Sequence, residues 1–231
     1  MRFEGDREGV FDIRGEVRKG FLRKLSHRDL PLNLIRTPPS RVKMIRQATN
    51  ERFYEQIKPR LHRRIGREVR LAHRVLDLGC GSCDLVRFLA GSYGQEVTGV
   101  DISDGSFPSR RHTPAGSHYH CLKRDAARLG FAKAGSADAV VSMWAMHEMA
   151  EPEAILREAR RVLRPGGEIF IVDFPRDSLA QQLWNEDYYR PHELKSLLER
   201  AGFQQVQVRL IENAQVMWAR GHRPPLARGA S

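Results

Sequence analysis

The sequence predicts an α/β fold: a doubly wound, mostly parallel sheet of seven strands behind a basic, mainly helical N-terminal extension. From residue 75 onward, short apolar runs typical of strands buried on both faces alternate with segments of helical periodicity. The first run, Val75–Leu78, is followed at once by Gly79 and Gly81 and then by a helix-like segment, as at the start of a nucleotide-binding βαβ unit. In such a sheet a ligand binds at the carboxyl ends of the strands.

Helical periodicity dominates the chain before the first strand. Between Ile13 and Leu25 apolar residues recur at every fourth position, which predicts a short amphipathic helix. Ser40 is a good N-cap for a second helix, and Pro59 is expected to kink or end that helix before a further helical piece begins. We therefore expect residues 1–70 to form a helical extension that covers the mouth of the domain behind it.

The remaining elements follow in alternation. Six further strands are predicted, the last two as an antiparallel pair, at residues 96–100, 118–122, 137–143, 168–172, 204–210 and 215–219. Helices are predicted at 152–163 and 193–201. The segment 104–117 contains two prolines and little periodicity, so a helix there should be short or missing. The domain is expected to span residues 71–220, and residues 221–231 to form a flexible tail.

The positive charge of the chain is concentrated before the sheet. Residues 1–74 hold 20 Lys and Arg against 9 Asp and Glu, a net charge of +11 that equals the net charge of the whole chain. Such an extension can attract nucleic acid, an acidic lipid surface or a phosphorylated substrate. An ordinary solvated surface explains the same charge equally well.

The composition suits a soluble globular protein, with 41% hydrophobic and 29% charged residues. The first ten residues lack the apolar run of a signal peptide, and no stretch approaches the roughly 20 apolar residues of a membrane span, so we expect a cytoplasmic protein. Three cysteines do not make a disulfide framework. Cys80 and Cys83 form a Cys-x-x-Cys pair, but zinc would need two further ligands and only Cys121 remains, so no metal is expected.

Acidic residues follow the predicted strands at the edge where a ligand should lie. Asp101 ends the second strand 20 residues after Gly81, the spacing at which a carboxylate reaches the two hydroxyls of a ribose. Asp125 follows the third strand, where its carboxylate could accept a hydrogen bond from an adenine amino group. A dinucleotide site would want glycine where this chain has Asp84, which tells against a dehydrogenase.

Five motifs follow one another in order: Val-Leu-Asp-Leu-Gly-Cys-Gly (75–81), Gly-Val-Asp-Ile-Ser (99–103), Asp-Ala (125–126), Ala-Asp-Ala-Val-Val-Ser-Met (137–143) and Val-Leu-Arg-Pro-Gly-Gly-Glu-Ile-Phe-Ile-Val-Asp (162–173). Together they resemble the class I S-adenosylmethionine-dependent methyltransferases, most of all the group with small-molecule acceptors that is similar to the ubiquinone and menaquinone methyltransferases. The resemblance covers roughly residues 70–220. It departs from the family at the N-terminal extension and at Cys83, where the family has its third glycine.

The resemblance implies S-adenosyl-L-methionine as the cofactor and a set of residues that bind it. The loop Gly79-Cys80-Gly81 would let the methionine part lie against the backbone, with Asp77 near its ammonium group. The other parts of the cofactor would be contacted from the later strand ends: Asp101 at the ribose hydroxyls, Ile102, Asp125 and Ala126 at the adenine, and Met143 and Trp144 beside the sulfonium.

Three residues are candidates for catalysis. His147 and Glu148 follow the fourth strand at the reactive end of the expected cofactor, where a general base would deprotonate the acceptor. Packing at the start of a helix under a lid is the alternative. Tyr188 lies in the 174–190 loop, where members of the family often contact the acceptor, and it too can be a packing residue. Tyr54, in the helix before the domain, is a candidate lid residue.

The leading prediction is an enzyme that transfers a methyl group from S-adenosylmethionine to a small-molecule acceptor by in-line displacement. One alternative is an RNA methyltransferase in which residues 1–74 hold the nucleic acid. Against it, the segment Asp173-Phe174-Pro175 lacks the second proline of the Asn/Asp-Pro-Pro-aromatic motif found in amino-methylating nucleic-acid enzymes. Another alternative is a module that binds the cofactor without turnover.

Overall fold

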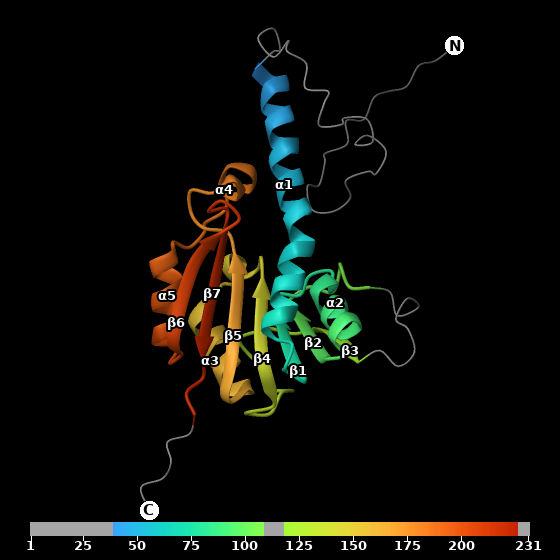
Figure 1. Ribbon diagram of the computed structural model, residues 1–231, viewed down its shortest axis with the longest axis vertical. Helices are drawn as coiled ribbons and strands as arrows, with labels where there is room; N and C mark the ends of the chain where they lie inside the picture. The colour runs from blue at the N-terminus through green and yellow to red at the C-terminus, as the bar shows by residue number, and fades with distance from the viewer. Residues whose placement is uncertain (1–38, 109–117, 226–231) are drawn as a thin grey trace, which may run out of the picture. The chain divides into compact units, whose positions relative to one another are not determined.

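A computed structural model describes residues 39–108 and 118–225 of the chain and contains one seven-stranded sheet with the strand order β3-β2-β1-β4-β5-β7-β6 (Figure 1). Strands β1 to β5 pair in parallel, whereas β7 runs antiparallel to both of its neighbours. This arrangement confirms the predicted α/β fold. The strands are β1 (Arg74–Leu78), β2 (Glu96–Asp101), β3 (Tyr119–Lys123), β4 (Ala137–Met143), β5 (Leu163–Asp173), β6 (Gln204–Ile211) and β7 (Val216–His222).

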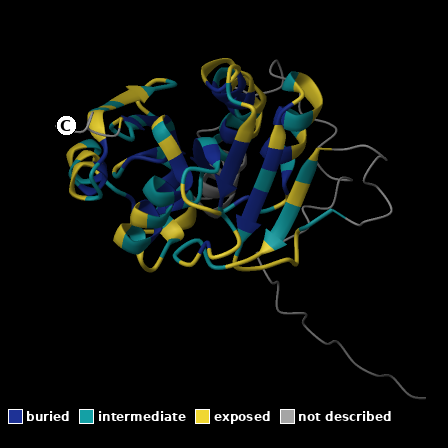
Figure 2. Ribbon diagram, turned by 90° about the horizontal axis from the view of Figure 1, so that it is seen from below, coloured by how far each residue is buried: buried dark blue, intermediate teal, exposed yellow. Residues whose placement is uncertain are grey.

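Helices bury both faces of the sheet. They are α1 (Pro39–Glu68), α2 (Asp84–Tyr93), α3 (Pro152–Val162), α4 (Leu179–Trp184) and α5 (Pro191–Arg200), with a short 3-10 helix, η3 (Met146–Glu148). Successive residues of a strand point to opposite faces. Val75 therefore joins the core under α1 and α2, while Leu76 joins the core under α3 and α5. The central strands are buried on both sides for this reason (Figure 2).

Helix α1 continues through Pro59, so the proline does not end the helix, and the residues predicted as a further helical piece belong to α1. Proline removes one backbone hydrogen bond of a helix. Here the proline ring lies on an exposed part of the helix, where water can satisfy the freed carbonyl group. Tyr54, Ile57 and Leu61 on either side of it are at most 2% exposed and pack into the same core, which holds both halves of the helix in place.

Two smaller differences concern element ends. Strand β5 begins at Leu163 and runs through Pro165-Gly166-Gly167, whereas the strand was predicted to begin at residue 168. The pairing register shifts here, because Ala137 pairs with Leu163 and Ala139 with Glu168. Residues 221 and 222, expected in the tail, belong to β7. The described residues 104–108 contain no helix, whereas 109–117 and the helix expected at 13–25 lie outside the described residues.

The chain divides into two compact units, residues 1–45 and 46–231. The sheet and every candidate site residue belong to the second unit. Within the described ranges, no helix combines the length and the apolar character that a membrane crossing requires.

Candidate active site

The turn after β1 brings the backbone close to the segment that follows β4. Gly79 has a φ of +74°, a conformation that favours glycine. A Cβ atom on Gly79 would lie 2.3 Å from the Cβ of Ala145, so any larger residue would collide with that segment. The Gly79 N–H donates to the carbonyl of Val100 at 2.9 Å, which ties the turn to the end of β2. The two strand ends therefore form one rigid edge.

Asp101 presents a fixed carboxylate at this edge. Its Oδ2 accepts a hydrogen bond from the N–H of Gly81 at 2.9 Å, and its Oδ1 accepts one from the N–H of Ser103 at 3.0 Å. Each carboxylate oxygen has two lone-pair sites, so both oxygens can still accept a hydroxyl group. The geometry suits the role predicted for Asp101 at a ribose.

A cavity of about 290 Å³ opens beside Gly79. Its lining includes the four residues predicted to contact the ribose and adenine (Asp101, Ile102, Asp125 and Ala126), the catalytic candidate Glu148, and also Ala145 and Met149. The side chain of Ile102 is 72% exposed, which leaves an apolar surface at the cavity open to an aromatic ring. The cavity thus matches the adenosine part of the expected cofactor.

Asp77 lies in β1 behind the glycine turn and is 2% exposed. Its Oδ1 atom is buried and finds no hydrogen-bond partner among the described residues. Burial, with the nearby charge of Asp101, raises the pKa of Asp77 to about 7. A buried carboxylate without a partner is costly unless a cation or donor reaches it. The ammonium group of the expected cofactor would supply one.

The two residues predicted beside the sulfonium lie outside the lining of this adenosine-sized cavity. Met143 and Trp144 are not among the described residues that line the cavity. Trp144 has a φ of +58°, and its ring stacks on that of Phe174 with 5.1 Å between the ring centroids. Phe174 also contacts Tyr54, whose hydroxyl oxygen accepts the N–H of Ala180 at 2.9 Å. These aromatic rings connect α1 with the start of α4 and bury Tyr54, the predicted lid residue.

A disulfide joins Cys83, the residue before α2, to Cys121 on β3, and Cys80 is the remaining thiol. One pair thus forms, although the sequence analysis expected no disulfide framework. Cys121 pairs with Gly99 across the β2–β3 ladder. A Cβ atom on Gly99 would lie 2.8 Å from the sulfur of Cys80, so the missing side chain leaves room for the side chain of Cys80. Cys80 itself is buried behind the loop rather than in the cavity wall.

His147 is held by the end of the neighbouring strand. It lies in η3 after β4, and Asp173 ends β5. The Nδ1 atom of His147 is 2.7 Å from Oδ1 of Asp173, and the backbone N–H of His147 donates to Oδ2 at 3.0 Å. Asp173 is fully buried, and Phe174 N–H also donates to it. The ring is therefore fixed in the manner of a histidine oriented by a buried carboxylate.

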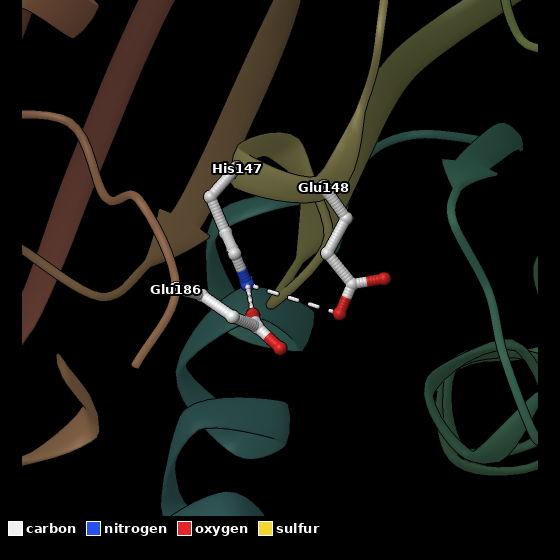
Figure 3. Close-up of side chains that lie close together, drawn as sticks. All are labelled: His147, Glu148 and Glu186. Carbon is white, nitrogen blue, oxygen red and sulfur yellow. Dashed lines mark hydrogen bonds and ion pairs between the residues drawn. The ribbon is translucent and has the colours of Figure 1, made fainter. Parts of the chain in front are cut away.

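Two further carboxylates converge on the other ring nitrogen (Figure 3). The Nε2 atom of His147 is 3.0 Å from Oε2 of Glu186 and 3.8 Å from Oε1 of Glu148. Burial of the ring lowers its pKa, but the hydrogen bond and charge of Asp173, with the charges of Glu148 and Glu186, outweigh burial and raise the pKa. One ligand atom from each of His147, Glu148 and Glu186 lies within 4.8 Å of the others, a spacing that could also hold a cation.

Tyr188 packs against His147 rather than facing the cavity. The two ring centroids are 4.5 Å apart, and the hydroxyl group of Tyr188 donates to Glu186 at 3.5 Å. Burial, followed by the charges of Glu186 and Asp173, raises the pKa of Tyr188. The phenol therefore stays protonated at neutral pH and is suited to donating a hydrogen bond, not to removing a proton.

Glu186 was missed by the sequence analysis. It lies in the irregular segment between α4 and α5, with no periodicity and no motif that would relate it to His147. Asp173 was named there only in the 162–173 motif and in the segment Asp173-Phe174-Pro175. Asp173 ends a buried strand that neighbours the strand before His147. This adjacency could have indicated that Asp173 and His147 meet.

Comparison with known proteins agrees with this geometry. A methyltransferase-domain family model matches residues 76–171. The chain is 32% identical to an uncharacterized methyltransferase from Synechocystis sp., over 65% of this chain and 76% of that protein. It is 31% identical to the O-methyltransferase cnsE of Penicillium expansum, over 67% of this chain and 61% of that protein, so it spans only about three fifths of that relative's length.

A solved structure shows the same fold. The structure described as a SAM-dependent methyltransferase from Archaeoglobus fulgidus superposes with a TM-score of 0.62 at 19% identity, over 73% of this chain and 93% of that one. The matched family region contains the glycine turn, Asp101 and the cavity wall. The open acceptor sites on Asp101 and the unpaired oxygen of Asp77 fit the family's cofactor. Since the sequence match, the fold and the fit of these residues agree, the chain belongs to the class I S-adenosylmethionine-dependent methyltransferases.

Proposed function

We propose that the protein transfers a methyl group from S-adenosylmethionine to a hydroxyl oxygen of a small-molecule acceptor, with His147 as the general base. The observation that carries this proposal is the imidazole of His147, oriented by a buried Asp173 next to a wall of the cofactor cavity. Glu148, the residue after His147, lines that cavity, so the base stands at its edge. The O-methyltransferase named among the relatives supports an oxygen acceptor.

The cofactor would be held by residues on three strand ends. Asp101 would accept the ribose hydroxyls, Asp125 the adenine amino group, and Asp77 would face the ammonium group, while Gly79 lets the backbone approach closely. Bound S-adenosylmethionine supplies a methyl group already activated by the positive sulfonium. The protein's main task is then to align the acceptor oxygen for in-line displacement.

An acceptor hydroxyl group must lose its proton as its oxygen attacks. His147 Nε2 would take that proton while Nδ1–H donates to Asp173, which stabilises the imidazolium that forms. Tyr188 would act by packing on the imidazole and by hydrogen bonding to Glu186, rather than as a second base. Glu148 would add negative charge near the imidazolium.

The direct test combines binding with turnover. We expect isothermal titration to show S-adenosylmethionine binding to the full chain, and radiolabelled cofactor to transfer its methyl group to members of a panel of phenols and hydroxy acids. Absence of binding to folded protein would contradict the cofactor site. Binding with label found only on amines or thiols would contradict the oxygen acceptor.

The RNA alternative rests on the charge of residues 1–74. Residues 1–38 of this segment lie outside the described part of the chain, so the structure adds no contact that favours RNA binding. If the protein is a module without turnover, it should bind the cofactor but give no labelled product with any acceptor. The same labelling experiment, with total RNA as one acceptor, separates all three possibilities.

The raised pKa of Asp77 makes cofactor binding depend on pH. An ammonium ion favours the ionised carboxylate, so below pH 7 the cofactor must first displace a proton from Asp77. We expect the affinity for S-adenosylmethionine to rise from pH 5.5 to pH 7, by up to about tenfold per pH unit at the acidic end. Asp77→Asn should weaken binding and flatten this dependence, as measured by titration calorimetry. A dependence that persists in Asp77→Asn would assign it to another group.

The same group affects stability without the cofactor. The folded state holds the proton of Asp77 up to about pH 7, whereas the unfolded chain loses it near the ordinary pKa of about 4. The contribution of Asp77 to stability therefore falls as the pH rises from 4 to 7. Asp77→Asn should unfold at a higher temperature than the wild type at pH 8, provided that both are measured without cofactor.

A further inference from the structure

The contacts of His147 hold it in a state in which it cannot act as a base. Both ring nitrogens lie within hydrogen-bond distance of a carboxylate oxygen, Nδ1 of Asp173 and Nε2 of Glu186. A carboxylate only accepts hydrogen bonds, so both contacts are attractive only if both nitrogens carry a proton. Such an imidazolium has no lone pair to receive the proton of an acceptor.

The two carboxylates differ in how firmly they are held. Asp173 is fully buried and accepts three hydrogen bonds, from the ring and the backbone N–H of His147 and from the N–H of Phe174. The side chain of Glu186 is 45% exposed and comes from the irregular segment between α4 and α5. In the described part of the chain, its other hydrogen bond is the one that the hydroxyl group of Tyr188 donates at 3.5 Å. Glu186 is thus the partner that can leave.

We propose that Glu186 is a positioning residue that keeps His147 protonated until an acceptor displaces its carboxylate from Nε2. This inference rests on the proposed function, since it concerns the same base. When Glu186 moves away, Nε2–H loses its partner and releases its proton to solvent. The freed Nε2 then accepts the proton of the acceptor hydroxyl, while Nδ1–H stays on Asp173. His147 therefore becomes deprotonated only after an acceptor has entered the site.

Among the described residues, three carboxylates act on the pKa of the His147 ring. Asp173 comes from the end of β5, Glu148 from η3 and Glu186 from the segment before α5. The ring also contacts the rings of Phe174 and Tyr188. Removing the charge of Glu186 therefore leaves Asp173 and Glu148 to set the pKa of His147.

The test is a histidine NMR titration of the full-length protein without acceptor, with the His147 signal identified by its loss in His147→Asn. We expect Glu186→Gln and Glu186→Ala to lower the titration midpoint of His147 by roughly half a pH unit or more, as is reasonable for a partly exposed ion pair. Asp187→Asn, which removes an exposed carboxylate on the same segment, should leave the midpoint unchanged. EDTA should not move the wild-type midpoint.

An unchanged midpoint in both Glu186 variants would overturn the proposal. A wild-type midpoint that moves with EDTA would also overturn it, because Glu186 would then be a metal ligand.

Turnover gives the second readout. With an acceptor found by methyl labelling, the acidic limb of the pH–rate profile should move to lower pH in Glu186→Gln but not in Asp187→Asn. The NMR result needs no turnover, so a failure of the proposed methyl transfer and a failure of this inference can be told apart.

Discussion

Replacing His147 with Asn should lower kcat for methyl transfer by about 10²–10⁴-fold, the range that general base catalysis contributes. Asn keeps a hydrogen-bond donor near Asp173 but offers no nitrogen that can take the acceptor's proton. His147 is not among the described residues that line the cofactor cavity, so the Kd for S-adenosylmethionine should change by about twofold at most. Stopped-time labelling assays and calorimetry measure the two quantities on the same preparation.

The companion variant Asp173→Asn checks that the two residues act as a unit. Groups that act together give non-additive losses, so His147→Asn/Asp173→Asn should be about as slow as His147→Asn alone. Because Asp173 is fully buried, its variants need a thermal unfolding curve to show that they fold. A full rate in His147→Asn would mean that the acceptor ionises without help from the protein, and a loss equal to the sum of both single losses would mean that Asp173 acts elsewhere.

The positions of the predicted cofactor contacts at one edge of the sheet were largely predictable from sequence, because these residues stand at fixed places relative to strands. A buried strand followed by Gly79 and Gly81 sets the turn, Asp101 ends the next strand along the chain, and Asp125 follows the one after it. Parallel strands bring their carboxyl ends to one edge, so spacing along the chain becomes proximity in space. The same rule predicts that His147 lies at this edge, but it does not predict which residues contact its ring.

The partners of His147, the disulfide and the course of α1 depend on contacts between segments whose spacing carries no such rule. Glu186 reaches His147 across 39 residues from a segment without periodicity. Cys83, just before α2, meets Cys121 of β3 across 38 residues. Pro59 fails to end α1 because the apolar residues around it are buried together, and tertiary packing overrides a local helix breaker.

Gly79→Ala should be the most destabilising single methyl addition in the glycine turn. The new Cβ would lie 2.3 Å from the Cβ of Ala145, and the residue would have to keep a φ of +74°. Overpacking costs about 1–3 kcal/mol and the left-handed conformation about 1–2 kcal/mol, so a loss of roughly 2–5 kcal/mol is expected. For a chain of this size that is a fall in Tm of roughly 5–15 °C. The turn should also lose its affinity for S-adenosylmethionine, because its backbone must shift away from Ala145.

Two variants separate the collision from the backbone strain. Gly81 has a φ of +48° but nothing within 4 Å of an added Cβ, so Gly81→Ala should cost only the conformational part, about 1–2 kcal/mol. Ala145→Gly removes the atom that the new Cβ of Gly79→Ala would collide with. The double variant Gly79→Ala/Ala145→Gly should therefore be more stable than Gly79→Ala by about 1–3 kcal/mol, after the cost of Ala145→Gly alone is subtracted. Urea unfolding of the wild type and the four variants measures each difference. Equal losses in Gly79→Ala and Gly81→Ala, or no relief from Ala145→Gly, would show that the close approach between the glycine turn and the segment after β4 does not constrain this site.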